Sequence, residues 1–239
     1  EKKGGGLNLS LQVLDGILAH NGEMLNKEYK PAFDKTWAIF ENEYRQCFET
    51  EDYEKKIVPM TLEGCVVRIS DVIAYIGRDI EDAIAVKLIK RDHIPLGVRS
   101  VLGSFNDEII NNLVLDLVKN SYGKDHLAFS ENIYKALDAL KDYNYKCIYS
   151  NPLIKTESPK IQTMFRHLFE KYVSLLQGNT KSSINEHFLN EMNEDYLRKT
   201  DDKRKAIDFI SGMTDDFFNN QYKELFVPQS YGYFVRENK

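Results

Sequence analysis

The sequence predicts an all-α fold. Apolar residues recur at three- and four-residue spacing along most of its 239 residues, which is the pattern of amphipathic helices. Strict alternation of apolar and polar residues never lasts long enough to build a sheet. Glycine, proline, asparagine and serine separate the periodic stretches, as expected at helix ends. We therefore predict one helical domain over residues 1–239, arranged as an irregular multi-helix bundle.

The first predicted helix covers residues 7–20 and has Asn8 or Ser10 as its cap. The second covers residues 31–53 and carries an aromatic stripe that we expect in the core: Phe33, Trp37, Phe40, Tyr44 and Phe48. The longest covers residues 62–89. A short segment at 96–102 follows it, and further helices are expected at 106–120, 130–143, 158–177, 183–198 and 201–225.

Composition narrows the class of protein. The net charge of −5 argues against a broad nucleic-acid surface, because such a surface needs a basic patch. A small anionic substrate would need a local cluster of Lys and Arg, or a bound cation. No window approaches the roughly 20 apolar residues of a membrane helix. Cys47, Cys65 and Cys147 are far apart and odd in number, which fits a cytoplasmic protein better than a disulfide framework.

The helix predicted at 62–89 divides into an apolar and a polar face. At 100° per residue, the polar side chains fall within a sector of about 100°: Arg68, Asp71, Tyr75, Arg78, Asp79 and Asp82. Carboxylates stacked at four-residue spacing repel one another, so in a cleft a cation or a hydroxyl-bearing ligand would compensate them. The spacing alone is more typical of an ordinary solvated face, with the arginines paired to the aspartates.

Three segments, in order, carry a resemblance to a known family. Residues 70–83 read SDVIAYIGRDIEDA, similar to a run A-D-x-I-A-Y-x-x-x-D-I-x-D-A. Residues 6–17 contain GLNLS and LDGI, and residues 208–215 read DFISGMTD. Together these segments resemble the dGTPase-like deoxynucleoside triphosphate triphosphohydrolases of the HD superfamily, and they span most of the chain.

The resemblance implies a helical bundle of the HD-domain dNTPase type. It implies hydrolysis of a deoxynucleoside triphosphate, with dGTP expected, to deoxynucleoside and triphosphate, with a divalent ion such as Mn²⁺ or Mg²⁺. By position, Asp71 matches a metal ligand. Tyr75 matches the tyrosine that packs on the deoxyribose and leaves no room for a 2′-hydroxyl. Asp79 matches the carboxylate that accepts from the 3′-hydroxyl. Asp82 is a neighbour that equally well holds Arg78 in place.

The sequence departs from the family in its metal ligands. It contains no His-Asp dipeptide, and one aspartate does not hold a catalytic ion alone. We expect the remaining His and His-Asp ligands upstream of Glu1, so that this chain is part of the enzyme and inactive by itself. A second chain that completes the site in trans is the alternative. We assign no catalytic residue within the chain.

Two further departures affect the expected site. Ile109 stands where the family often has an arginine, so another cation is expected at the phosphates: Lys87, Lys90, Arg91 or Arg99. Residues 24–60 are longer and more aromatic than the family pattern, which leaves an insertion or an oligomer contact as interpretations.

Three functions compete. The first is the dNTP triphosphohydrolase, which by resemblance we expect to be a homo-oligomer without a membrane partner. The second is a non-catalytic helical regulatory or interaction module with the same fold, which the absent ligands favour. The third is an HD-type phosphohydrolase for a different phosphate ester, against which Tyr75 and Asp79 argue.

Overall fold

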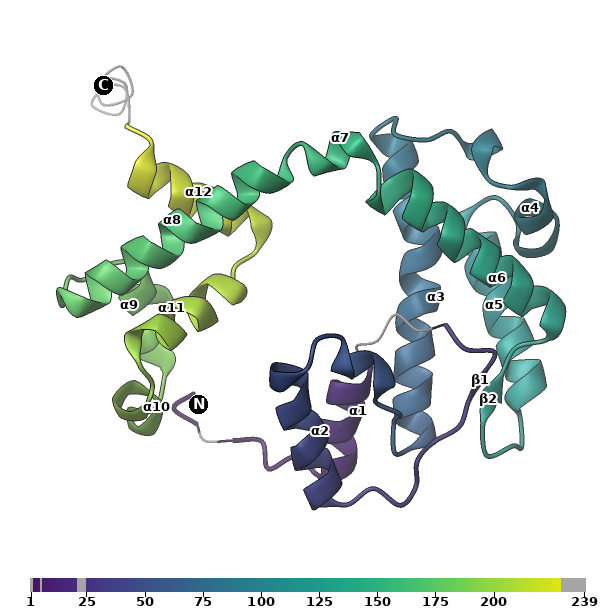
Figure 1. The fold of residues 1–239 in the computed structure, drawn as a ribbon, viewed down its shortest axis with the longest axis horizontal. Helices are drawn as coiled ribbons and strands as arrows, with labels where there is room; N and C mark the ends of the chain where they lie inside the picture. The colour runs from purple at the N-terminus through teal and green to yellow at the C-terminus, as the bar shows by residue number, and fades with distance from the viewer. Residues whose placement is uncertain (1, 5, 21–24, 229–239) are drawn as a thin grey trace. The chain divides into compact units, whose positions relative to one another are not determined.

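The computed structural model describes residues 2–4, 6–20 and 25–228 (Figure 1). It confirms the all-α prediction, because helices account for most of this part of the chain and its strands form one two-stranded sheet. The chain separates into two compact units, residues 8–154 and residues 1–7 with 155–239, whereas the sequence predicts one domain over residues 1–239. No helix within the described ranges combines the length and the apolar character needed to span a lipid bilayer.

The larger unit is built around α3 (Leu62–Ala85). This helix packs against α1 (Leu11–Ala19), α5 (Asn106–Ser121) and α6 (Glu131–Asn144), while α4 (Leu96–Leu102) packs on α5 and α6 (Figure 1). Strands β1 (Glu28–Tyr29) and β2 (Leu127–Ala128) pair antiparallel. A short helix, α7 (Pro152–Lys155), follows α6 at the end of this unit.

The core of the larger unit forms from the apolar face predicted for α3. Ile69, Ile73, Ile76 and Ile80 are all buried, and they pack with Ile109 and Leu113 of α5 and with Leu137 and Leu140 of α6. Burial of a side chain of this size contributes about 1.5–3 kcal/mol relative to its exposure. One face of α3 is therefore fixed by apolar packing, which leaves its other face to carry polar groups.

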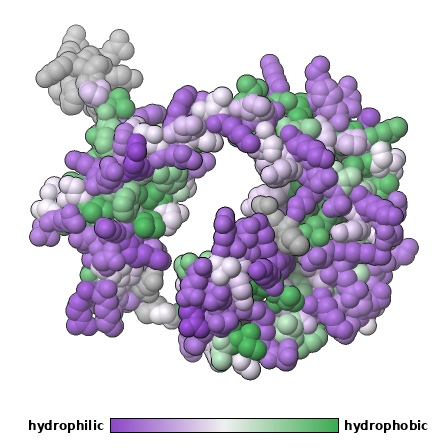
Figure 2. Space-filling view, viewed as in Figure 1, coloured by the Kyte–Doolittle hydropathy of each residue, from purple (hydrophilic) through white to green (hydrophobic). Residues whose placement is uncertain are grey.

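Helix α2 (Trp37–Glu49) contradicts two expectations. It begins at Trp37 rather than at residue 31, because Thr36 caps it by accepting a hydrogen bond from the Ile39 amide at 3.4 Å. Its aromatic stripe is not core, since none of its residues is buried and Phe48 is 69% exposed. Hydrophobic residues accordingly remain visible at the surface of the molecule (Figure 2).

A buried charge cluster attaches the region of α2 to the rest of its unit. Lys35 Nζ lies 2.8 Å from the Asp15 carboxylate of α1 and 2.7 Å from that of Glu43 in α2. Asp15 also accepts from the Met60 amide at 2.6 Å. Because Lys35 and Asp15 are almost fully buried, these contacts replace water for both charges.

The smaller unit contains α8 (Ser158–Gln177), α9 (Ser183–His187), α10 (Glu194–Lys199), α11 (Asp202–Ser211) and α12 (Asp215–Phe226). Its core includes Leu168, Tyr172, Ile184 and Phe209. The helices predicted at 183–198 and 201–225 are each interrupted. Asn193 caps α10 and Thr214 caps α12, so local side-chain hydrogen bonds start new helices where periodicity alone suggests continuous ones.

Candidate functional site

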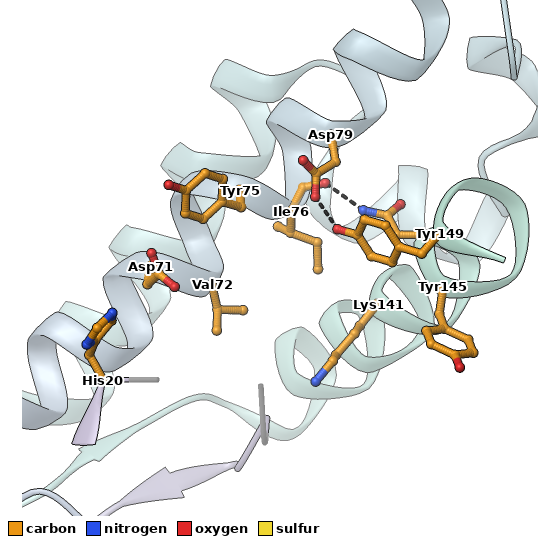
Figure 3. Close-up of a pocket in the computed structure, with 10 residues that line it drawn as sticks. His20, Asp71, Val72, Tyr75, Ile76, Asp79, Lys141, Tyr145 and Tyr149 are labelled. Atoms are coloured by element: carbon orange, nitrogen blue, oxygen red, sulfur yellow. Dashed lines mark hydrogen bonds between the residues drawn. The ribbon is translucent and has the colours of Figure 1, made fainter. Parts of the chain in front are cut away.

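The polar face of α3 lines a pocket in the larger unit. Asp71, Tyr75 and Asp79 lie on successive turns of the helix and all border this cavity, whose volume is about 370 Å³ (Figure 3). This size falls in the range of small-molecule sites. The other lining residues come from the end of α1, from α3 and from α6 with the turn after it: His20, Val72, Ile76, Lys141, Asn144, Tyr145 and Tyr149. The structure thus brings the three predicted site residues together at one cavity.

Local interactions fix the two walls of the pocket. Thr61 caps α3 by accepting from the Gly64 amide at 3.0 Å. Asn144, which is buried at the end of α6, donates to the Ile76 carbonyl of α3 at 2.8 Å. This contact joins the helix that carries the predicted residues to the helix that faces them. The backbone that carries the pocket side chains is therefore held in place by the packing of α6 on α3.

A π-helical turn at Tyr145–Tyr149 follows α6 directly and forms part of the pocket. Its Tyr149 hydroxyl donates a hydrogen bond to the Asp79 carboxylate (Figure 3). Turns of this kind occur mostly within α-helices and frequently at functional sites. Periodicity does not predict this tyrosine at the site, since it ends the helix at residue 143. The spacing of Lys141, Tyr145 and Tyr149, four residues apart, is the sequence signal that could have placed them on one face.

Two basic residues also border the cavity, and the sequence predicts neither of them there. Lys141 is half-buried and reaches the pocket from α6. His20 follows α1, and its Nδ1 lies 2.6 Å from the Ile17 carbonyl oxygen. Because a carbonyl oxygen only accepts, Nδ1 donates in this contact, and in a neutral ring Nε2 is then the acceptor. The sequence by itself suggests for His20 only a favourable charge at a helix end.

The remaining polar residues of α3 are tied to other partners. Arg68 is buried rather than on the open face, and it donates to the Ile57 carbonyl. Desolvation by burial lowers the pKa of this guanidinium. Arg78 pairs with Asp82 at 3.1 Å on the exposed surface, which confirms the interpretation of Asp82 as the residue that holds Arg78.

The cations expected to replace a family arginine do not border the pocket. Arg91 is held by Glu81 at 2.6 Å and by the Ser104 carbonyl at 2.6 Å. The hydrogen bond from Arg91 lowers the pKa of Glu81 below its usual value. Lys87, Lys90 and Arg99 are absent from the lining of this cavity, and Ile109 is fully buried in the core.

The described residues do not form a metal site by themselves. Nowhere in residues 2–4, 6–20 and 25–228 do three or more His, Cys, Asp or Glu side chains gather closely enough to hold an ion. Asp71 offers one exposed carboxylate at the pocket, and a catalytic ion needs several protein ligands. Asp71 is therefore at most one member of a larger set of ligands.

The other two segments that carry the family resemblance, residues 6–17 and 208–215, make specific contacts within their own units. In the smaller unit, Asp208 accepts from the Tyr196 hydroxyl at 2.7 Å and from Arg204 at 2.7 Å. Thr214 accepts from the Phe217 amide at 3.3 Å and begins α12. In the larger unit, Asp15 belongs to the buried charge cluster. These contacts give both segments a role in folding that spacing alone does not indicate.

Comparisons with known proteins agree with the resemblance. Residues 127–224 match the family described as Phosphohydrolase-associated domain. A deoxyguanosinetriphosphate triphosphohydrolase-like protein of Caldanaerobacter subterraneus is 30% identical over 95% of this chain and 55% of its own length. A relative of the same description from Clostridium perfringens is 30% identical over 96% of the chain and 57% of its length. One from Rickettsia prowazekii is 26% identical over 93% and 62%.

The similarity covers nearly all of this chain, but the chain spans little more than half the length of these relatives. The family match in residues 127–224 and the alignments over the whole chain support one another, and both agree with the three segments that first indicated the family. Over nearly its whole length the chain is similar to the deoxyguanosinetriphosphate triphosphohydrolase-like proteins, and its residues 127–224 match the Phosphohydrolase-associated domain.

Proposed function

We propose that this chain is part of a metal-dependent deoxynucleoside triphosphate triphosphohydrolase of the cytoplasm, with dGTP as the expected substrate. The observation that carries the proposal is the shared pocket of Asp71, Tyr75 and Asp79. The names of the relatives support it, since each is described as deoxyguanosinetriphosphate triphosphohydrolase-like. In this proposal the products are the deoxynucleoside and triphosphate.

Tyr75 and Asp79 would select the sugar. Tyr75 is 59% exposed and borders the cavity, so a deoxyribose can lie against its ring, and the ring would fill the space of a 2′-hydroxyl. Asp79 is an acceptor for the 3′-hydroxyl, and its hydrogen bond with Tyr149 orients it before the ligand arrives. A site built to accept from a hydroxyl rejects analogues that lack it, because its acceptor would be left unpaired.

Asp71 would contribute one carboxylate to a divalent ion such as Mn²⁺ or Mg²⁺. Oxygen ligands suit these hard ions. The remaining ligands would come from residues outside these 239, since the sequence contains no His-Asp dipeptide. We propose on this ground that the chain alone has no activity. The competing function, a non-catalytic helical module with this fold, is favoured by the same shortage of ligands.

The test is release of deoxynucleoside and triphosphate from each of the four dNTPs with Mn²⁺ or Mg²⁺. The assay compares this chain alone with this chain joined to the segment that supplies the remaining ligands. We expect turnover only from the joined protein, and we expect Asp71→Ala to reduce it by at least about 100-fold through loss of the metal. Undiminished turnover by Asp71→Ala would remove its metal role, and inactivity of the joined protein would favour the non-catalytic module.

We also propose that the active protein is a homo-oligomer. The exposed aromatic residues of α2 support this, because contiguous apolar surface commonly marks a protein interface. Light scattering over a range of protein concentrations tests it, and a monomer at every concentration would contradict it.

A further inference from the structure

Helix α2 presents a row of aromatic side chains to solvent. Trp37, Tyr44 and Phe48 are between 51% and 69% exposed, and at 100° per residue they lie within a sector of about 40°. Together with Phe40 they form the aromatic row, in which consecutive ring centroids lie 5.1 to 6.3 Å apart. Aromatic residues are enriched at protein interfaces over the rest of the surface, so the row is suited to contact another protein surface.

The buried charge cluster fixes the direction in which the row points. Glu43 of α2 lies 2.7 Å from Lys35, whose Nζ lies 2.8 Å from Asp15 of α1. Glu43 and Tyr44 are successive residues, so their side chains point about 100° apart around the helix. With Glu43 held towards α1, the row is held facing outward before any partner arrives. A face that is already ordered loses less entropy on binding.

Two opposite charges border the row along one edge. Glu41 and Arg45 are both exposed and lie one helical turn apart. Arg45 donates to the Asn42 side chain at 3.2 Å, and within the described residues neither Arg45 nor Glu41 has a charged partner in an ion pair. A partner with charge of one sign would satisfy only one of these two groups. A surface that carries the same two charges in reverse order would satisfy both.

A second copy of α2, running antiparallel, is such a surface. In a two-fold contact, residue i of one copy meets residue j of the other, and j meets i. The midpoint between Glu41 and Arg45 is Glu43. The midpoint between Trp37 and Phe48 lies half a residue away, about 0.8 Å along the helix. One two-fold axis therefore brings both pairs together across the contact, with the Tyr44 rings beside the axis.

We propose that α2 is a self-association surface, where two copies of the chain pair their aromatic rows antiparallel about a two-fold axis near Glu43. This inference rests on the proposed homo-oligomer and names its contact surface. Glu41 of each copy pairs with Arg45 of the other. The surface lies within residues 24–60, which are longer and more aromatic than the family pattern, so the resemblance does not predict it. Three rings from each copy cover less than a standard interface of about 1,600 Å², and we expect micromolar affinity.

The test is sedimentation velocity on the 239-residue chain at about 1 to 300 µM. The variants are Glu41→Arg, Arg45→Glu and the double variant that carries both. Each single reversal leaves like charges facing each other on both sides of the axis, and the double variant restores opposite charges. Glu49→Arg is the matched control. It changes the net charge as Glu41→Arg does and is also exposed on α2, but it lies about 100° or more from each exposed ring of the row.

We expect each single reversal to weaken dimerisation by at least about tenfold, because like charges face each other across the contact. The double variant and Glu49→Arg dimerise as wild type does. An equimolar mixture of the two single variants also dimerises, since every pair across the axis is then opposite in charge.

Circular dichroism checks that each variant is folded. Wild-type dimerisation by both single variants overturns the inference and leaves a homo-oligomer that uses another surface. Folded single variants that stay monomeric when mixed overturn it as well. A wild type that is monomeric throughout contradicts both the inference and the proposed homo-oligomer. Triphosphate release tests the proposed hydrolase separately, so failure of either proposal is distinguishable from failure of the other.

Discussion

Helices α2 and α3 have the same kind of sequence pattern and opposite surroundings. Both carry large apolar residues at three- and four-residue spacing, yet α3 buries Ile69, Ile73, Ile76 and Ile80, and α2 buries none of its residues. The spacing of apolar residues shows that one face of a helix differs from the other, but it does not show what covers that face. In this protein, α3 packs against several other helices of its unit, whereas α2 meets α1 and the short turn at Tyr53–Lys56.

The sharpest test of this contrast removes the charge that holds the region of α2. Asp15→Ala leaves Lys35 buried beside Glu43 alone and deprives the Met60 amide of its acceptor. Removal of one partner from a buried pair costs about 3–5 kcal/mol, so we expect a loss of this size in the free energy of unfolding. Denaturant unfolding followed by circular dichroism measures it. A loss below about 1 kcal/mol would show that apolar contacts, and not this cluster, attach α2.

A paired substitution compares the two helices directly. Ile69→Ala in α3 removes a fully buried side chain, and we expect a loss of about 2–5 kcal/mol. Phe48→Ala in α2 removes a larger side chain that is 69% exposed, and we expect a change within about 0.5 kcal/mol. Unfolding midpoints of both variants, at a concentration where the protein is monomeric, check the comparison. Similar losses would contradict the burial described for α2.

A smaller effect depends on pH and belongs to α3 alone. The hydrogen bond from Arg91 lowers the pKa of Glu81 in the folded protein, so the pair stabilises the fold at pH values above the usual range of a glutamate. This contribution is lost as the pH falls through the lowered pKa, because protonation of Glu81 removes its charge. We expect it to be about 1 kcal/mol, since both side chains are partly exposed.

Unfolding of wild type and Glu81→Gln at neutral pH and at a pH below the lowered pKa measures this contribution. The two proteins should differ at neutral pH and converge in acid. A difference that stays constant with pH would show that the charge of Glu81 is not its source. Phe48→Ala serves as the control, because its small effect involves no titrating group.

The sequence was enough to predict the helical class and the buried face of α3, since both follow from local periodicity. It also predicted that Asp71, Tyr75 and Asp79 share one face, and in the structure all three border one cavity. It did not predict the exposure of α2 or the interruptions in the smaller unit. Those depend on what packs against a helix and on single caps such as Thr214.

The opposite wall of the pocket could not be predicted from the sequence, and the reason is physical. Tyr149 contacts Asp79 across 70 positions of the chain, and Asn144 contacts Ile76 across 68. Such pairs are fixed by the packing of α6 on α3, which no local pattern encodes. The roles of the pocket residues stay predictions, because geometry places them together without a ligand.

The π-helical turn gives the pocket an unusual sensitivity to chain length. In effect it is an α-helix with one residue inserted, which changes the angular position of everything that follows. At the ordinary α pitch, with no residue removed, these five residues would carry the Tyr149 side chain further around the axis, because the wider turn absorbs one extra residue. The Tyr149 hydroxyl would then lose its hydrogen bond to Asp79, although every chemical group of the pocket would still be present in the molecule. Alignments of this region therefore need to be judged by their gaps as well as by the residues they match.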